Sequence, residues 1–131
     1  MSAGPPPTLR IERLTARAFA PFGAVLRPDP ARGREINQGF ATRFHDLAEI
    51  DVAAEGGRVC VSIFRATARP FPAPIEMLER HPLGAQAFAP MSRAPWLAVV
   101  AESGPDGRPD AARLRAFRAP AGVGLVYARG V

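Results

Sequence analysis

The chain has 131 residues, a length typical of one domain, and a hydrophobic content of 47% allows it to bury a core. Its formal net charge is +5, and all 17 basic residues are arginines scattered along the chain without a basic run or interleaved aromatic residues. This scatter argues against a nucleic-acid-binding protein, and no apolar run approaches the ~20 residues of a membrane helix. The arginine content fits either biased genome composition or a surface that attracts small anions.

Cys60 is the only cysteine, so no disulfide can form within the chain. This usage fits a reducing, cytoplasmic location. Because Cys60 lies in an apolar run, we expect it to be packed and chemically inert. Residues 1–7 are small and proline-rich and lack the features of a signal peptide. We therefore expect a disordered leader over residues 1–8 and a single domain over residues 9–131.

The N-terminal third predicts short elements separated by turns. Residues 9–14 begin with apolar–polar alternation, which favours a strand. Thr15 is placed to cap one helical turn over residues 15–19. A second strand is expected at 22–26, a loop at 28–33 and an extended segment at 36–45.

Residues 58–65 carry the clearest strand pattern in the chain. Val59, Val61 and Ile63 alternate with Cys60, Ser62 and Phe64, so the first three share one face. Arg65 has the parity of that face and would lie at the mouth of the core, where it could meet an anion. Alternatively the strand ends at Phe64 and Arg65 turns outward; the pattern leaves both open.

The remaining elements point to an all-β fold. Residues 68–74 contain three prolines and predict a loop or an edge, and 75–78 fits a helical turn or, preferably, a strand that places Met77, Glu79 and His81 on one face. The apolar run 96–101 predicts a strand covered on both sides, followed by a turn at 103–107. Two more strands are expected at 114–117 and 123–127. Many short strands divided by turns favour a sandwich or barrel.

Residues 79–91 hold the densest group of chemically useful side chains. Glu79, Arg80, His81 and Gln86 surround a turn at 82–84, which can bring them to one polar site. Histidine can transfer a proton near neutral pH, glutamine can hold an amide, and arginine can clamp a carboxylate. The alternative is that His81 is a hydrogen-bonded turn residue and that Glu79 and Arg80 are solvated charges.

Other chemistries find little support. With only His45 and His81, a three-histidine zinc site within one chain is impossible, and no zinc-finger spacing or phosphate-binding loop occurs. Ser62 and Ser92 stand in no nucleophile-elbow pattern. A second polar cluster, Asn37 with Arg43 and His45, gives a weaker signal, since His45 and its neighbour could simply cap a turn.

Five ordered blocks of the sequence resemble the ureidoglycolate lyase family, formerly called ureidoglycolate hydrolase. The strongest block is Leu-Glu-Arg-His-Pro-Leu-Gly-Ala-Gln-Ala-Phe-Ala-Pro-Met at 78–91. The other four are Ala-Phe-Ala-Pro-Phe-Gly at 18–23, Ile-Asn-Gln-Gly at 36–39 with Arg-Phe-His-Asp-Leu at 43–47, Ser-Ile-Phe-Arg-Ala at 62–66 and Leu-Arg-Ala-Phe at 114–117.

The resemblance implies a cupin-like double-stranded β-barrel (jelly roll) that forms a cytoplasmic homodimer and acts in allantoin breakdown. The implied reaction splits (S)-ureidoglycolate into glyoxylate and urea. We expect His81 to transfer the proton, Glu79 to orient His81 or to share in that transfer, and Gln86 to hold the ureido group or the carbinol oxygen. The expected substrate-binding set is Arg65, Asn37, Arg43, Arg80 and His45, within which Arg65, helped by Asn37 or Arg43, would hold the carboxylate.

The resemblance also bears on cofactors and on completeness. The sequence itself requires no cofactor; some family members are described with nickel, for which His81, Glu79 and Gln86 would supply part of a cupin-type site. Family members continue beyond position 131 with a Trp-His-His-Pro run, so we expect a domain incomplete at its C-terminal end. An alternative function is therefore a shortened, non-catalytic domain that binds glyoxylate or a similar small acid.

Overall fold

The computed structural model describes residues 4–131. The expected all-β, cupin-like fold is confirmed, because these residues form strands joined by short helical turns. Of the expected leader, residues 1–3 lie outside the described part, and residues 4–8 are exposed without helix or strand. The strands are β1 (Ile11–Arg13), β2 (Gly23–Leu26), β3 (Gly33–Ile36), β4 (Ala41–Phe44), β5 (Gln86–Phe88), β6 (Trp96–Val100), β7 (Arg115–Ala119) and β8 (Gly124–Tyr127). The helical segments are α1 (Ala16–Phe19) and the 3-10 turns η1 (Pro30–Arg32), η2 (Asn37–Gly39), η3 (Ala54–Gly56) and η4 (Ala111–Arg113).

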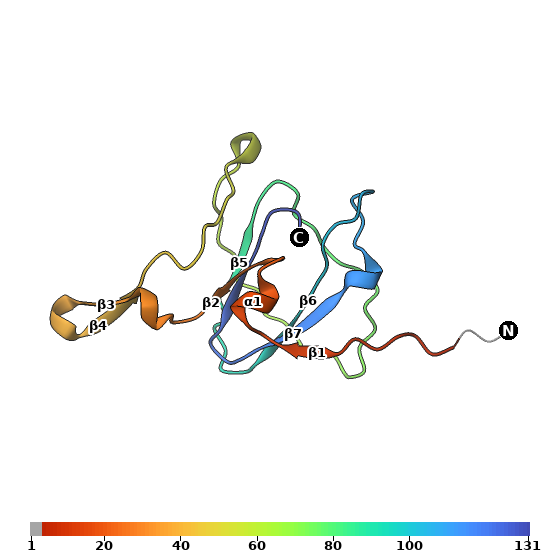
Figure 1. Cartoon of the computed structure of the whole chain (residues 1–131), viewed down its shortest axis with the longest axis horizontal. Coiled ribbons are helices and arrows are strands. Elements are labelled where there is room, and N and C mark those ends of the chain that lie inside the picture. Colours follow the sequence, from red (N-terminus) through yellow and green to blue (C-terminus); the bar gives the residue numbers. More distant parts are fainter. Residues whose placement is uncertain (1–3) are drawn as a thin grey trace.

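Two three-stranded sheets among the described residues form the body of the molecule (Figure 1). One sheet has the order β1-β7-β6, with β1 parallel to β7, and the other has the order β2-β8-β5. The β3–β4 ribbon extends away from this body (Figure 1). The apolar core of the described residues draws its members from both sheets and from α1. Its buried members are Leu14, Phe19, Phe22, Ala98, Val100, Phe117, Ala119 and Leu125.

The helical turn α1 forms where the sequence predicts it. The Thr15 hydroxyl accepts a hydrogen bond from the Ala18 amide at 3.0 Å and thereby caps the helix. One turn later Phe19 is completely buried, and its ring meets the Phe117 ring edge-on at a centroid distance of 5.5 Å. The cap thus fixes the start of α1, and the helical turn then places Phe19 in the core.

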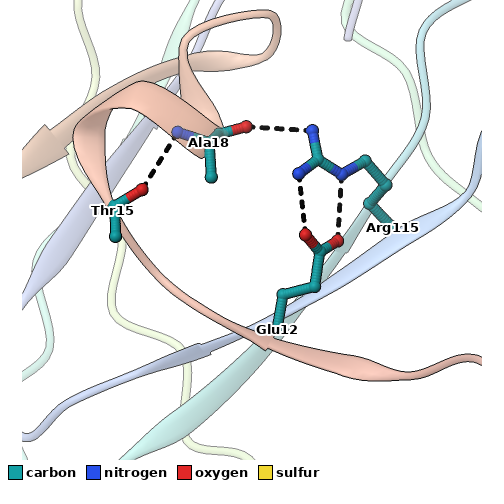
Figure 2. A network of polar contacts seen from close by, with 4 residues as sticks. All are labelled: Glu12, Thr15, Ala18 and Arg115. Carbon is teal, nitrogen blue, oxygen red and sulfur yellow. Dashed lines mark hydrogen bonds and ion pairs between the residues drawn. The ribbon is translucent and has the colours of Figure 1, made fainter.

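Arg115 joins three elements through one guanidinium group (Figure 2). Its Nε and Nη2 atoms donate to the two carboxylate oxygens of Glu12 at 2.9 and 2.8 Å, and Nη1 donates to the Ala18 carbonyl at 3.0 Å. The guanidinium also stacks 4.9 Å from the centroid of Phe117. The hydrogen bonds from Arg115 lower the pKa of the Glu12 carboxyl below its ordinary value.

The strand expected at 58–65 does not form. Residues 57–70 have no regular secondary structure and are exposed; Val61 is 90% and Ile63 78% exposed. The expectation that Cys60 is packed was wrong, because its side chain is exposed. Arg65 likewise faces solvent and not the mouth of the core. A strand needs neighbours that pair its amide and carbonyl groups, and no other described strand pairs with these residues.

Other expected elements differ in smaller ways. Residues 75–81 form no strand, so Met77, Glu79 and His81 do not share a strand face. The extended segment expected at 36–45 is interrupted by η2, in which Asn37 and Gln38 adopt left-handed φ angles of 53° and 58°. The expected loop at 28–33 contains η1. β6 is covered on one side only, since Ala98 and Val100 are buried while Leu97 is 37% exposed.

No helix in residues 4–131 has the length and apolar character that crossing a membrane requires.

Candidate functional site

A cavity of about 240 Å³ opens at one end of the β2-β8-β5 sheet. It is bounded by β5, β6 and β8, by residues 77–80 and by the loop that follows Ala101. This volume is a little below the ~300–1,000 Å³ of typical ligand pockets, so it suits a small molecule. Apolar side chains such as Phe88 and Val99 form its walls, and its polar side chains are Glu79, Arg80, Gln86, Ser103 and Tyr127.

The pairing of β5 with β8 places Gln86 in the cavity. Gln86 lies directly opposite Tyr127, and Phe88 lies opposite Leu125. Directly paired residues of antiparallel strands project to the same face, so Gln86, Phe88 and Tyr127 stand on one side of the sheet. The sequence-based placement of Gln86 in a small polar site is therefore consistent with its position among the lining residues.

Arg80 lines the cavity in a fixed position. Its Nη1 atom donates to the carbonyl of Gly107, another lining residue, at 2.8 Å, which ties Arg80 to the loop that follows Ala101. The other donor groups of this guanidinium remain available for a bound anion, since arginine carries five N–H donors. Arg80 is thus the basic side chain that the described structure brings to the cavity lining.

Glu79 and His81 form a pair at the edge of the cavity. The His81 Nε2 atom lies 3.5 Å from Glu79 Oε1, and their side chains are 45% and 82% exposed. Glu79 belongs to the lining, whereas His81 does not. The main chain holds His81 in place, because its carbonyl accepts from the Gly130 amide at 3.0 Å. The pair therefore stands beside the cavity, with Glu79 on the cavity side.

The structure does not bring the rest of the expected substrate-binding set to this cavity. Arg65 lies in the exposed segment 57–70. Asn37, Arg43 and His45 lie in or directly after the β3–β4 ribbon, where Arg43 Nη2 contacts His45 Nδ1 at 2.6 Å. The participation of these four residues in binding stays a prediction from the family resemblance.

The residues present do not fit a nickel centre. In residues 4–131 no three side chains of His, Cys, Asp or Glu come together in a way that could hold a metal ion. The Glu79–His81 pair supplies two donors, and Gln86 is a weak third ligand for a borderline-soft ion. We therefore assign no chemical step to nickel.

Two polar lining residues, Ser103 and Tyr127, were missed in the sequence-based prediction. The Ser103 hydroxyl donates to the Gly130 carbonyl at 2.9 Å, so it supports the same main-chain segment that holds His81. Burial raises the pKa of the Tyr127 phenol, so this group keeps its proton above the usual range. The strand parity of residues 123–127 was a usable signal, since it places Tyr127 on the face of the buried Leu125.

Comparison with known proteins relates this chain to one family. The family model described as ureidoglycolate lyase matches residues 6–131. A ureidoglycolate lyase of Burkholderia mallei (strain NCTC 10229) is 52% identical over 95% of this chain and 71% of the relative. Ureidoglycolate lyase 1 of Rhizobium meliloti (strain 1021) is 50% identical over 94% of this chain and 71% of the relative. A ureidoglycolate lyase of Rhizobium etli (strain CIAT 652) is 47% identical over 96% of this chain and 74% of the relative.

The five sequence blocks quoted above all lie within the matched residues 6–131. The chain belongs to the ureidoglycolate lyase family.

Proposed function

We propose that the chain is a carbon–nitrogen lyase that splits (S)-ureidoglycolate into glyoxylate and urea. The observation that carries the proposal is the Glu79–His81 pair, 3.5 Å apart, beside a cavity that also presents Gln86 and Arg80. Family membership supports the same reading, because the relatives named above are ureidoglycolate lyases. The cavity, of about 240 Å³, suits a small acid.

The net reaction transfers one proton from the hydroxyl group to the nitrogen of the leaving urea. The substrate is a carbinolamide, so the hydroxyl loses its proton, the carbonyl of glyoxylate forms and the carbon–nitrogen bond breaks. The nitrogen of the leaving urea gains one proton, which balances the equation without any external reagent. The Glu79–His81 pair is suited to this transfer, because a histidine oriented by a carboxylate can accept and return a proton near neutral pH.

The cavity supplies the binding groups for this substrate. Arg80 offers N–H donors to the carboxylate, and the Gln86 carboxamide can pair with the ureido group or the carbinol oxygen. These roles leave the apolar walls, including Phe88 and Val99, to exclude water from the reacting carbon.

Replacing His81 tests the proposal. We expect His81→Ala to lower turnover of racemic ureidoglycolate by about 10²- to 10⁴-fold, the usual contribution of general acid–base catalysis. The fold should survive, because the His81 side chain is 45% exposed. Glyoxylate and urea are measured together, and circular dichroism checks the fold. Near-normal glyoxylate release would contradict the assignment, and ammonia in place of urea would indicate an amidohydrolase.

A second function is binding of glyoxylate or a similar small acid without turnover. One observation favours it: Arg80 and Gln86 line the cavity, whereas the His81 imidazole lies outside the lining. Calorimetric titration with glyoxylate, compared with the turnover assay, separates the two. Binding without release of urea supports the second function, and urea release supports the first.

We also propose that the chain acts as a cytoplasmic homodimer in allantoin degradation. The exposed segment 57–78 supports self-association, because it offers unpaired main chain and large apolar side chains. Full burial of one such side chain removes roughly 60–120 Å² from water, so seven of them remove roughly 420–840 Å², which is about half or more of the ~800 Å² per partner of a standard interface. The seven are Val59, Val61, Ile63, Phe64, Phe71, Ile75 and Met77. The single, exposed cysteine suits a reducing compartment.

A further inference from the structure

The proposed reaction assigns no role to two polar lining residues, Ser103 and Tyr127, and the Ser103 hydroxyl already donates to the Gly130 carbonyl. Tyr127 ends β8, the central strand of its sheet, directly opposite Gln86 on β5 and Gly23 on β2. Because opposite residues project to the same face, the phenol and the Gln86 carboxamide stand side by side at the cavity. Gly23 has no side chain, so nothing from β2 competes for space at this level of the sheet.

The Tyr127 ring is held firmly by other aromatic rings. Its centroid lies 5.0 Å from that of Phe88 and 6.1 Å from that of Phe19. A tyrosine anchored in this way has few remaining conformations, so its hydroxyl is presented at a defined position. None of the hydrogen bonds found within residues 4–131 uses this hydroxyl. The hydroxyl is therefore available to a molecule in the cavity.

The phenol is a neutral donor under physiological conditions. Burial disfavours the phenolate, so the hydroxyl keeps its proton. A neutral donor beside a carboxamide matches a neutral, planar amide better than it matches a carboxylate, which pairs more strongly with a guanidinium. Arg80, which lines the same cavity, is that guanidinium.

We propose that Tyr127 and Gln86 together recognise the ureido group of the substrate. Tyr127 Oη donates to the ureido carbonyl, the Gln86 carboxamide oxygen accepts from a ureido N–H, and Arg80 binds the carboxylate. Tyr127 is then a specificity-determining residue that separates ureido acids from other small hydroxy acids. The assignment rests on the proposed function for its substrate class, but it makes a separate claim about binding.

Two small-molecule probes distinguish binding of the ureido group from binding of the carboxylate. N-carbamoylglycine carries a ureido group and a carboxylate, whereas glycolate carries a carboxylate and a hydroxyl without the ureido group. Calorimetric dissociation constants are measured for both probes with the whole chain and with Tyr127→Phe, which keeps the ring and removes only the hydroxyl. We expect Tyr127→Phe to weaken N-carbamoylglycine about 3- to 12-fold, the range for one net hydrogen bond, and to leave glycolate within about 2-fold.

Arg80→Ala is the matched comparison, and we expect it to weaken both probes. A Tyr127→Phe variant that binds N-carbamoylglycine as tightly as the unchanged chain overturns the inference. Equal weakening of both probes by Tyr127→Phe overturns it as well, and so does an unchanged chain that binds neither probe or binds both equally. Selective loss of N-carbamoylglycine binding in a chain that releases no urea supports the inference while contradicting the lyase reaction.

Discussion

Glu12 and Arg115 form the best-connected ion pair of the described structure. They lie 103 positions apart in sequence, yet two parallel hydrogen bonds join them, and a third reaches the Ala18 carbonyl (Figure 2). Their side chains are 21% and 33% exposed, so water screens the pair only in part. A bidentate, partly desolvated pair is stronger than an ordinary surface salt bridge. We infer that it holds β1 and α1 onto β7.

We predict that Glu12→Gln lowers the free energy of unfolding by about 1.5–3 kcal/mol at pH 7, the range for hydrogen bonds to charged groups. The pKa of Glu12 is lowered from 4.5 by the Arg115 hydrogen bonds, so the stabilisation is complete above pH 4.5. It is lost as the pH falls through the lower folded-state pKa. Urea unfolding of the unchanged protein and of Glu12→Gln should therefore show a difference in the free energy of unfolding at pH 7 that shrinks below pH 4.5.

The control for this prediction is Glu49→Gln, which removes the charge from an exposed carboxylate. We expect it to change the free energy of unfolding by less than about 0.5 kcal/mol. Equal effects of the two substitutions, or a Glu12 effect that persists in acid, would show that the ion pair is not the source of the stability.

At the scale of elements, β8 organises both the core and the cavity. Leu125 and Val126 are buried, and the strand pairs with β2 on one side and β5 on the other. The close approach of β2 depends on Gly23, whose φ is +151°. A Cβ atom at this position would lie 1.8 Å from the Val126 carbonyl oxygen. The glycine therefore permits the pairing that sets Tyr127 at the cavity.

We predict that Gly23→Ala destabilises the fold by about 3–5 kcal/mol, because the added methyl group meets rigid backbone in an unfavourable conformation. Gly39→Ala is the matched control. Gly39 also has a positive φ, +86°, but an added Cβ meets nothing within 4 Å. The loss of stability caused by Gly39→Ala should therefore stay near the ~1–2 kcal/mol that a residue with a side chain costs in a left-handed conformation. Thermal unfolding compares the two, and similar costs would contradict the role assigned to Gly23.

At the scale of the whole molecule, the exposed segment 57–78 is the feature least compatible with an isolated monomer. Large apolar side chains exposed along one segment mark an interaction site when they form a contiguous patch. Val59, Val61 and Ile63 retain the alternating pattern that would place them on one face of a paired strand. Pairing with a second copy would satisfy the main chain and cover these side chains.

We predict that the chain self-associates and that Ile63→Asp weakens the association at least about 10-fold, because it puts a charge on the apolar face. Ser62→Asp adds the same charge on the opposite face and should weaken association less. Light scattering after size-exclusion chromatography, over a range of concentrations, measures both. A chain that stays monomeric throughout, or equal effects of the two substitutions, would contradict this pairing.

Local signals in the sequence determined the elements that need only nearby residues. Thr15 capped α1 as predicted, because its partner is the amide three positions later. The strands expected at 22–26, 114–117 and 123–127 correspond to β2, β7 and β8 within a few residues. A turn also forms at Pro82 and Leu83 where the sequence predicts it. Short-range patterning was sufficient in each case.

Only the tertiary structure decided which of the predicted strands pair with another strand. The pattern of residues 58–65 is the most strand-like in the chain, yet no other strand of the described structure pairs with it. The cavity likewise depends on the register of β5 against β8, which puts Tyr127 beside Gln86 although 41 positions separate them. Sequence blocks singled out Glu79, Arg80 and Gln86, but only the folded chain shows that His81 lies outside the lining. Contacts between distant segments carry no local signature, so they appear only when the chain is folded.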